Sequence, residues 1–356
     1  MLDHYCSSAA LYPAELFWRD NFAHIIGRGY RLRSRYNPDW VPSWQNGRQQ
    51  RGAEDSIPTR GFCGNVNNAW RCVDDLPVVL KRARHDELAI LQHLHGLPRS
   101  PDNRTIPLLD FFPVEHDLHS FIIVMPMCGR IDEPPVFTQL GDLLRAFHQL
   151  AKGLSFMHQY RIAHRDACVG NFVEDRSRLV PGGQQFKLSR LQPDGRKQIK
   201  SLKRSAIQPA YYIIDFELSL IEAHAAQCCG KVGQDKSVPE DSDQNYDPFL
   251  RDIYQFGSAI RTYFLEKYEG LEPVLHLVDQ MTRTISTERP TAADVAQQLQ
   301  LLCEEFPVGP RICLRNASYF AKRRIQFMNR AQLYLARIRN NRETREIGTI
   351  PVSPRV

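Results

Sequence analysis

The chain has 356 residues, 42 % of them hydrophobic and 24 % charged, which is the composition of an ordinary globular protein and not of a fibrous or disordered one. Its 46 basic and 40 acidic side chains leave a mild net charge of +6, and no nucleic-acid-binding motif accompanies that charge. No signal peptide opens the sequence, and the longest apolar run, residues 121–128, is too short for a transmembrane segment.

Residues 1–60 are predicted to form an N-terminal extension. An amphipathic helical stretch occupies about residues 15–26, and an aromatic run rich in Arg and Pro follows over residues 29–44. This run is too aromatic for a free linker, so we expect it to pack on a folded lobe.

Hydrophobic periodicity predicts the elements beyond residue 60. They are two strands within residues 66–82 around the turn at Asp74-Asp75, a helix over 85–94, a buried strand over 121–125, a long amphipathic helix over 139–159, a short strand at 172–173, a strand over 211–216, and a mainly helical chain from 249. The nine cysteines include no C-x-x-C pair, which predicts reduced thiols in an intracellular protein, cytoplasmic or nuclear. A metal site formed by His224, Cys228 and Cys229 is the alternative.

Several motifs follow one another along the chain. They are Val78-Val79-Leu80-Lys81, Val124-Met125-Pro126-Met127-Cys128-Gly129, the segment from His164-Arg165-Asp166 to Asn171, Ile214-Asp215-Phe216-Glu217, Val238-Pro239-Glu240, Asp252 and Glu288-Arg289-Pro290. The third reads H-R-D-x-x-x-x-N, the catalytic-loop pattern of protein kinases. In this order the motifs resemble the eukaryotic protein-kinase superfamily over about residues 60–303. The chain also resembles divergent kinase-like proteins of filamentous and mushroom-forming fungi.

The resemblance implies an α+β, bilobal protein kinase-like fold with a small β-rich N-lobe and a larger, mainly helical C-lobe. The N-lobe and hinge would cover residues 61–130, and the C-lobe 131–305, with a basic insertion at about 176–210. Residues 306–356 would form a basic helical tail. The chemistry implied is transfer of the ATP γ-phosphoryl group to a protein hydroxyl, with ATP and Mg²⁺ as cofactors.

The resemblance also implies the roles of individual residues. Asp166 would accept the proton of the substrate hydroxyl, and Asn171 and Asp215 would hold magnesium. Lys81 would bind the ATP phosphates, positioned by Glu87, although a separation of six residues is short for the family. Further nucleotide contacts would come from the hinge residues Met125, Pro126 and Cys128 and from a glycine-rich loop with Gly61, Gly64 and Val66. Structural roles would fall to His164, Arg165, Phe216, Glu240, Asp252 and Arg289.

Four positions depart from the family pattern. Glu217 replaces the glycine of D-F-G, Thr59 replaces the first glycine of the loop, Cys168 stands where serine/threonine kinases carry a phosphate-binding Lys, and Gln234 stands where they carry its Thr partner. A pseudokinase, a scaffold that keeps the fold with little turnover, is therefore the alternative to an active enzyme. A kinase of small metabolites is the third possibility, and the A-P-E-like Val238-Pro239-Glu240 and Asp252 argue against it. Serine or threonine is preferred over tyrosine as the substrate on family frequency alone.

Two basic segments and the activation segment complete the predictions. The insertion is predicted to be a mobile, solvated loop, with a docking site for an acidic partner as the alternative. In the tail, one helical face is predicted to dock on the C-lobe, with an anionic membrane or a nucleic acid as the alternative contact. That face holds Phe320, Phe327, Met328, Ala331, Leu335 and Ile338. The activation segment, residues 215–240, has no hydroxyl side chain between Ser219 and Ser237, which predicts activity that is not switched by phosphorylation of this loop.

Overall fold

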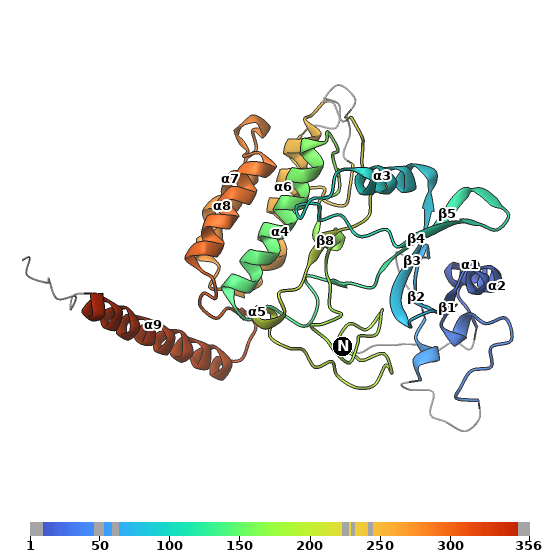
Figure 1. Ribbon diagram of the computed structural model, residues 1–356, viewed down its shortest axis with the longest axis horizontal. Helices are drawn as coiled ribbons and strands as arrows, with labels where there is room; N and C mark the ends of the chain where they lie inside the picture. Colours follow the sequence, from blue (N-terminus) through green and yellow to red (C-terminus); the bar gives the residue numbers. More distant parts are fainter. Residues whose placement is uncertain are drawn as a thin grey trace, which may run out of the picture.

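The protein is described here by a computed structural model that places residues 10–45, 53–58, 64–222, 228, 232–240 and 245–347. A β-sheet with helices α1–α3 forms one lobe, and a larger group of helices forms the other (Figure 1). Of the predicted metal site, Cys228 is described, whereas His224 and Cys229 lie outside the described residues.

The N-lobe is built on a five-stranded antiparallel sheet in the order β1-β2-β3-β5-β4. Its strands are β1 (Tyr30–Leu32), β2 (Val66–Arg71), β3 (Leu76–Arg84), β4 (Asp110–Val114) and β5 (Asp117–Pro126). The predicted hairpin of β2 and β3 is confirmed, and its register pairs Val66 with Lys81. Helix α3 (His85–Gly96) follows β3 without a linker.

The two faces of this sheet have different neighbours because side chains alternate along a strand. Ala69, Val78 and Leu80 lie on the outer face and are buried in a cluster with Trp18 of α1. Lys81 and its cross-strand partner Val66 lie on the other face, which is turned toward the C-lobe. The sheet therefore offers one face to the N-terminal helices and the other to the cleft between the lobes.

The N-terminal residues form part of the N-lobe and its sheet. The predicted aromatic run does pack on a lobe, and Tyr30–Leu32 is the edge strand of the sheet. The helix predicted over 15–26 is instead two helices, α1 (Pro13–Asp20) and α2 (Phe22–Gly27). They separate at Asn21, whose side-chain Nδ2 donates to the carbonyl of Phe17 at 2.9 Å, a local bond that competes with continuation of the helix.

The C-lobe packs its long helices around a common core. These are α4 (Leu140–Gln159), α6 (Pro248–Ile260), α7 (Glu272–Met281) and α8 (Ala292–Glu305). Shorter elements are β6 (Gly129–Arg130), η3 (Val169–Asn171), β7 (Phe172–Glu174), α5 (Arg204–Ile207), β8 (Tyr211–Ile213), η5 (Arg261–Leu265), β9 (Tyr268–Glu269), η6 (Ser286–Glu288) and β10 (Cys313–Leu314). Strands β6, β7 and β8 form a small sheet. The predicted helix over 139–159 is confirmed as α4, whereas the strand predicted over 211–216 ends at Ile213, shortly before Asp215 adopts a positive φ of 69°.

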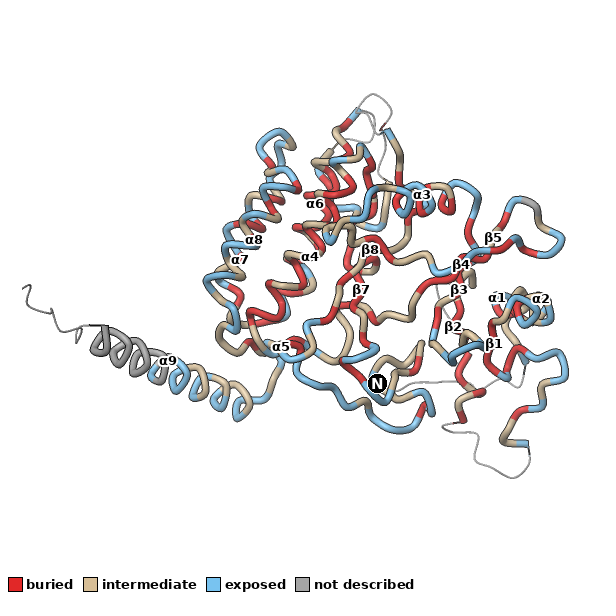
Figure 2. The backbone as a smooth tube through the Cα atoms, viewed as in Figure 1, coloured by how far each residue is buried: buried red, intermediate tan, exposed pale blue. Residues whose placement is uncertain are grey.

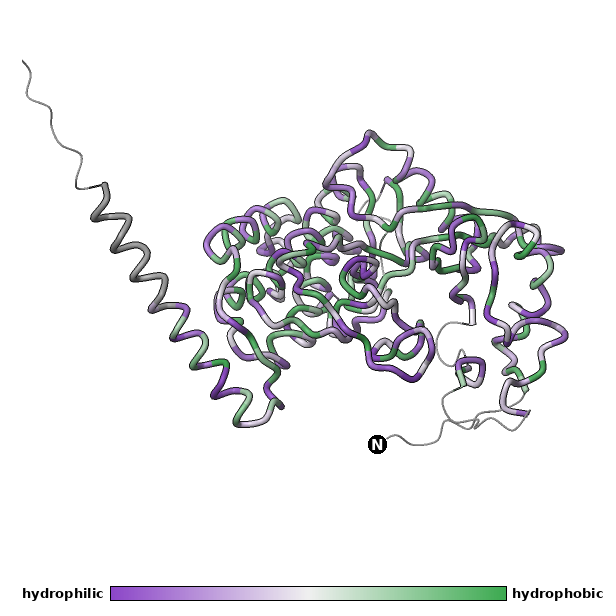
Figure 3. The backbone as a smooth tube through the Cα atoms, turned by 60° about the horizontal axis from the view of Figure 1, so that its bottom comes forward, coloured by the Kyte–Doolittle hydropathy of each residue, from purple (hydrophilic) through white to green (hydrophobic). Residues whose placement is uncertain are grey.

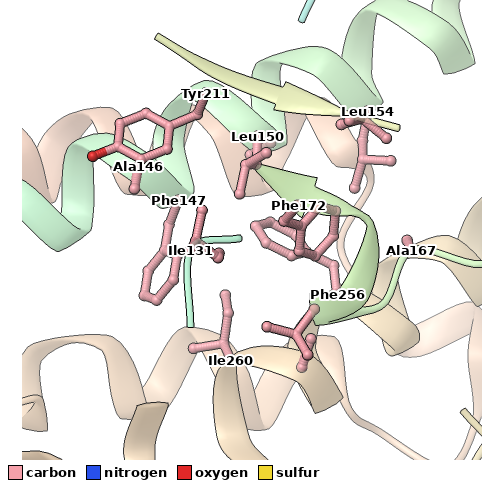
Figure 4. Close-up of a cluster of buried hydrophobic side chains, with 14 of the residues drawn as sticks. Ile131, Ala146, Phe147, Leu150, Leu154, Ala167, Phe172, Tyr211, Phe256 and Ile260 are labelled. Carbon is pink, nitrogen blue, oxygen red and sulfur yellow. The ribbon is translucent and has the colours of Figure 1, made fainter. Parts of the chain in front are cut away.

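Aromatic side chains join the central elements of the C-lobe (Figure 4). The rings of Phe172 (β7) and Phe256 (α6) meet edge to face with centroids 5.4 Å apart, and Phe147 (α4) contacts Phe256 at 6.5 Å. Ala167 belongs to the same buried cluster and is fully buried. The segment 164–171 is therefore anchored in the core by its own sequence, and Figure 2 shows the buried chain around β7 and α4.

The prediction of a mobile, solvated insertion is wrong for its two ends. Arg176 and Arg204 are buried, and both form ion pairs with the fully buried Glu174, at 3.2 and 2.6 Å. The hydroxyl of Tyr211 donates to the same carboxylate at 2.9 Å. Between these ends the insertion makes its own backbone hydrogen bonds, such as Gln192 N to Lys197 O at 2.7 Å. Two of its basic side chains are therefore structural.

Helix α9 (Tyr319–Ile347) leaves the C-lobe as a long arm (Figure 1). The prediction that its aromatic face docks on the C-lobe is wrong for Phe320 and Phe327, which are 82 % and 71 % exposed. Among the described residues no helix is long and apolar enough to span a bilayer. The predicted fold class is confirmed: the protein is α+β and bilobal, with a protein kinase-like arrangement of a small β-rich lobe and a larger helical one.

Candidate functional site

Three charged side chains from separate elements meet in the cleft. The ammonium of Lys81 (β3) lies 2.6 Å from Glu87 Oε1 and 2.7 Å from Asp215 Oδ1. Glu87 stands in the first turn of α3, which begins at His85 directly after β3. The absence of a linker between strand and helix explains why a separation of only six residues lets Glu87 reach Lys81.

The electrostatics of this triad favour the charged forms of Lys81 and Asp215, whereas burial raises the pKa of Glu87 above its ordinary value despite the nearby Lys81 ammonium. Burial of the Lys81 ammonium opposes its charge, but the carboxylates of Glu87 and Asp215 outweigh burial and raise the pKa of Lys81. Burial likewise opposes the charge on Asp215, yet Lys81 lowers the pKa of Asp215 below its ordinary value. The site therefore holds a fixed cation between two anions, and phosphate oxygens could take the place of either anion.

The carboxylate of Asp166 is surrounded by hydrogen-bond donors. Asn171 Nδ2 donates to Oδ2 at 3.0 Å and to the Asp166 carbonyl at 2.9 Å. Gln234 donates from its backbone N–H to Oδ1 at 2.7 Å and from Nε2 to Oδ2 at 2.9 Å. Only 4 % of the Asp166 surface is exposed. A substrate hydroxyl could therefore hydrogen-bond to the Asp166 carboxylate only if it displaced one of these donors.

The segment carrying Asp166 is tied to helix α6. Asp252 accepts from the backbone N–H groups of His164 at 2.8 Å and of Arg165 at 2.6 Å, which is the structural role predicted for it. Gln255, one turn later on α6, accepts from Ala167 N at 3.1 Å and donates to the Arg165 carbonyl at 3.2 Å. The backbone of Arg165 has a positive φ of 66°, so these bonds hold a conformation that a non-glycine residue rarely adopts.

Sequence reasoning missed Gln255 as well as His158, which contacts Asp252 Oδ2 at 2.9 Å. A signal for Gln255 exists, because residues three apart on a helix share a face and Asp252 was already assigned. No comparable signal exists for His158, which comes from α4.

The segment from Ile214 to Glu217 brings Asp215 beside Asn171. Ile214 N donates to the Asn171 carbonyl at 3.0 Å, and the Ile214 carbonyl contacts His164 Nε2 at 3.0 Å. Phe216 is fully buried and meets the His164 ring edge to face at 5.4 Å. The positive φ falls on Asp215 and not on Glu217, which is exposed, so Glu217 needs no glycine-like freedom in this conformation.

The donor set at this point suits a hard cation. Asn171 uses Nδ2 for both bonds to Asp166, which leaves its side-chain carbonyl oxygen as a ligand atom. Asp215 engages Lys81 through Oδ1 and accepts from the backbone N–H of Glu217, and its carboxylate oxygens have further lone pairs for a cation. Carboxylate and amide oxygens beside a phosphate site are typical Mg²⁺ ligands. Among the described residues no group of three or more His, Cys, Asp or Glu side chains could hold a metal.

The predicted hinge follows β5. Met125 is buried on the cleft face of the sheet opposite Val79, and Pro126 is paired with Val78. The N–H of Met127 donates to the Pro77 carbonyl at 3.3 Å. Burial raises the pKa of the Cys128 thiol.

A cavity of about 380 Å³ opens beside this hinge, between the ends of β2 and β3 and the insertion. Its lining includes Asn68, Trp70, Pro77, Pro126, Met127 and Phe186. The side-chain oxygen of Asn68 is buried without a hydrogen-bond partner. The hinge thus lies next to a partly open pocket of the size that small ligands occupy.

The predicted glycine-rich loop has an unusual setting. The connection from β1 to β2 runs over residues 33–65, and it contains the short helical turns η1 (Ser34–Tyr36) and η2 (Glu54–Ser56). Gly64 packs against α1, where a Cβ would lie 3.0 Å from that of Ala14. Gly61 lies outside the described residues, so phosphate contacts from this loop remain a prediction. Val66 stands opposite Lys81 in the β2–β3 ladder.

Two further predicted residues, Arg289 and Glu240, form an ion pair in the C-lobe. The guanidinium of Arg289 forms an ion pair with Glu240 and donates to the Leu250 carbonyl at 3.1 Å. Arg165 donates from Nη1 to the Leu218 carbonyl at 3.3 Å. The pair of Glu240 and Arg289 therefore ties the end of the activation segment to the start of α6.

Comparisons with known proteins add little to this geometry. No protein-family model matches the chain, and no curated protein matches it. Among solved structures the chain is similar to the Rad53 kinase domain and SCD2, with a TM-score of 0.42 and 15 % identity over 66 % of this chain and 83 % of that chain.

Proposed function

We propose that this protein is an ATP-dependent protein kinase that transfers the γ-phosphoryl group to a hydroxyl of a protein substrate. The observation that carries the proposal is the meeting of Lys81, Glu87 and Asp215 within hydrogen-bond distance. These residues lie up to 134 positions apart in the chain, so their proximity results from the tertiary fold and not from nearness in the sequence.

Each residue of the site has a defined task in this proposal. Lys81, kept charged and oriented by Glu87, binds the oxygens of the α- and β-phosphates. Asn171 and Asp215 supply oxygen ligands for the Mg²⁺ that accompanies ATP and neutralises its charge. Asp166 orients the acceptor hydroxyl and takes its proton as the oxygen–phosphorus bond forms.

The remaining assignments concern the adenine contacts, the acceptor residue and the substrate sequence. Met125, Pro126 and Cys128 would face the adenine at the end of β5, where Pro126 lines the cavity beside the cleft. Serine or threonine as the acceptor rests on family frequency. The exposed basic side chains of the insertion, such as Arg178 and Lys200, favour an acidic stretch in the substrate.

A nucleotide-binding scaffold with little turnover is the second candidate function. One observation favours it: both oxygens of the Asp166 carboxylate already accept hydrogen bonds, two of them from Gln234. Neither the lysine of serine/threonine kinases nor its threonine partner is present at positions 168 and 234. A scaffold would keep the triad for binding and would not need an accessible base.

Magnesium-dependent phosphate transfer by the wild type and by Asp166→Asn separates the two functions. Loss of the base should lower kcat by about 10²–10⁴ while leaving ATP affinity nearly unchanged. The matched control is Asp235→Asn, a carboxylate that accepts only from Ser237 among its described contacts. Equal rates for wild type and Asp166→Asn, with ATP still bound, would establish the scaffold.

A further inference from the structure

Helix α9 is held against the C-lobe by one polar side. Asn329 and the backbone of Arg311 exchange two hydrogen bonds, of 2.8 Å from Arg311 N and 3.0 Å from Asn329 Nδ2. Lys322, seven residues earlier, forms an ion pair of 2.6 Å with Glu269. Residues seven apart lie on the same side of a helix, so these contacts fix which way α9 faces.

The opposite side of α9 carries a row of exposed aromatic rings. Phe320, Phe327 and Tyr334 are 82 %, 71 % and 66 % exposed. These rings are also seven residues apart. Phe320 precedes Lys322 by two positions and Phe327 precedes Asn329 by two positions, which is a rotation of about 200° around the helix. The aromatic row is therefore turned away from the C-lobe by the same bonds that hold the helix. A row of exposed rings of this kind marks an interaction surface.

An arginine follows each aromatic residue at the same interval. Arg323 and Arg330 stand three positions after Phe320 and Phe327 and are exposed, and the sequence repeats the pattern with Arg337 after Tyr334. Positions i and i+3 are neighbours on a helix surface, so a basic row borders the aromatic row. Figure 3 shows polar and apolar positions alternating along the coloured part of α9.

The positive charge of the whole chain is concentrated in this helix. Residues 319–347 contain eight Lys and Arg and two Glu, a net charge of 8 − 2 = +6. The full chain has 46 basic and 40 acidic side chains, so the remainder has 38 of each and is neutral. The occupant of the surface must therefore combine an apolar layer with negative charge.

We propose that α9 binds the surface of membranes that contain anionic lipids. The aromatic row would enter the boundary between headgroups and acyl chains, and the bordering arginines would pair with lipid phosphates and carboxylates. A second copy of the helix fits less well, because pairing two aromatic rows would bring the arginine rows together. Nothing in this proposal depends on catalysis by the cleft.

The test is flotation of the full-length protein with vesicles of phosphatidylcholine alone and of phosphatidylcholine mixed with phosphatidylserine. We expect binding only to the mixed vesicles and a decline as salt is added. Changing Phe320 and Phe327 together to serine should weaken binding at least tenfold, because each buried ring contributes strongly. Changing Arg323 and Arg330 together to glutamine should weaken it about 25-fold, at roughly fivefold per arginine.

The matched control changes Arg178 and Lys200 of the insertion to glutamine. Both side chains are exposed, and the change removes the same charge as the arginine pair while leaving α9 intact. Its binding should equal that of the wild type. The Phe320 and Phe327 variants should also keep the wild-type melting temperature, since both rings are already exposed.

Four results would overturn the proposal. They are absence of wild-type binding to the mixed vesicles, equal binding to both kinds of vesicle, equal weakening by the insertion control, and full binding by the serine variant. Sedimentation velocity would detect a dimer, and a binding assay with single-stranded DNA would detect a nucleic-acid partner, in place of the membrane. A dimer or a DNA complex that the serine variant loses, without vesicle binding by the wild type, would assign the surface to that partner.

Discussion

Gln234 holds both oxygens of the Asp166 carboxylate, Oδ1 through its backbone N–H at 2.7 Å and Oδ2 through its side-chain amide at 2.9 Å. Gly233 before it has a positive φ of 88°, and a Cβ there would come within 2.7 Å of the Arg165 carbonyl. The segment around Gly233 therefore lies directly on the loop that carries Arg165 and Asp166. A general base must offer an oxygen to the hydroxyl that it deprotonates, and the amide of Gln234 occupies one such position.

Replacing Gln234 by alanine should raise kcat/KM for phosphoryl transfer roughly tenfold. The change removes a hydrogen bond to a charged group, worth about 1.5–3 kcal/mol, and leaves the backbone bond to Oδ1 in place. Steady-state kinetics with a hydroxyl-bearing peptide substrate measures the effect. The control is Gln255→Ala, which loosens the loop without freeing the carboxylate and should lower kcat. A fall in kcat/KM for Gln234→Ala would instead make Gln234 a residue that positions Asp166.

The resemblance to protein kinases, carried by the order of the motifs, predicted which residues would meet in the cleft. Lys81, Glu87 and Asp215 were selected from short patterns, and the structure brings them within 2.7 Å. The β2–β3 hairpin was also predictable, because its strands are β-branched runs on either side of Asp74-Asp75.

Tertiary pairing was not predictable in the same way. The insertion was interpreted as solvated because all but one of its charged residues are basic, and Glu174, which neutralises Arg176 and Arg204, precedes the run. In α9 the periodicity reveals an apolar stripe but does not say which side docks. Asn329, whose partner is backbone, decides that orientation, and backbone partners leave no trace in a side-chain pattern.

Replacing Lys81 by methionine should destabilise the protein as well as abolish phosphate binding. The Lys81 and Glu87 side chains are 8 % and 3 % exposed, so the change leaves the buried Glu87 carboxylate without its cation. Breaking a buried pair in this way costs about 3 kcal/mol at pH 7. Urea unfolding measures the loss, and Arg261→Met, which breaks the exposed pair with Asp279, should change stability little.

The destabilisation by Lys81→Met should shrink as the pH falls. In the wild type Lys81 lowers the pKa of Asp215, a contribution to stability that is present above the unfolded-state pKa and lost on acidification. In the variant Glu87 and Asp215 lose their counter-ion, so protonation relieves their repulsion as the pH falls. The ordinary pKa of Asp215 is 3.8, so the wild-type contribution is lost only below that value, and the unfolding free energies of both proteins measured at pH 7 and at pH 3 should converge. A constant difference between the two pH values would contradict the assignment of Lys81 as their counter-ion.

Replacing Glu174 by glutamine should destabilise the protein by about 3–5 kcal/mol. The side chain keeps its shape, but the buried Arg176 and Arg204 lose the carboxylate that neutralises both. Thermal and urea unfolding measure the effect, and Asp74→Asn is the control because it breaks an exposed pair with Arg71. Comparable stability of Glu174→Gln and the wild type would mean that the ends of the insertion are held by their bonds to backbone carbonyls alone.

Cys168, beside the proposed base, should resist alkylation in the folded protein. Burial, followed by the negative charge of Asp166, raises the pKa of the Cys168 thiol to about 12. At pH 8 the reactive thiolate is then roughly one part in 10⁴ of this side chain. Cys72 is exposed on the β2–β3 turn and should be modified before Cys168 by iodoacetamide, as peptide mass spectrometry would reveal. Labelling of Cys168 at the rate of Cys72 would show that the loop opens to solvent and that the donors around Asp166 exchange readily with substrate.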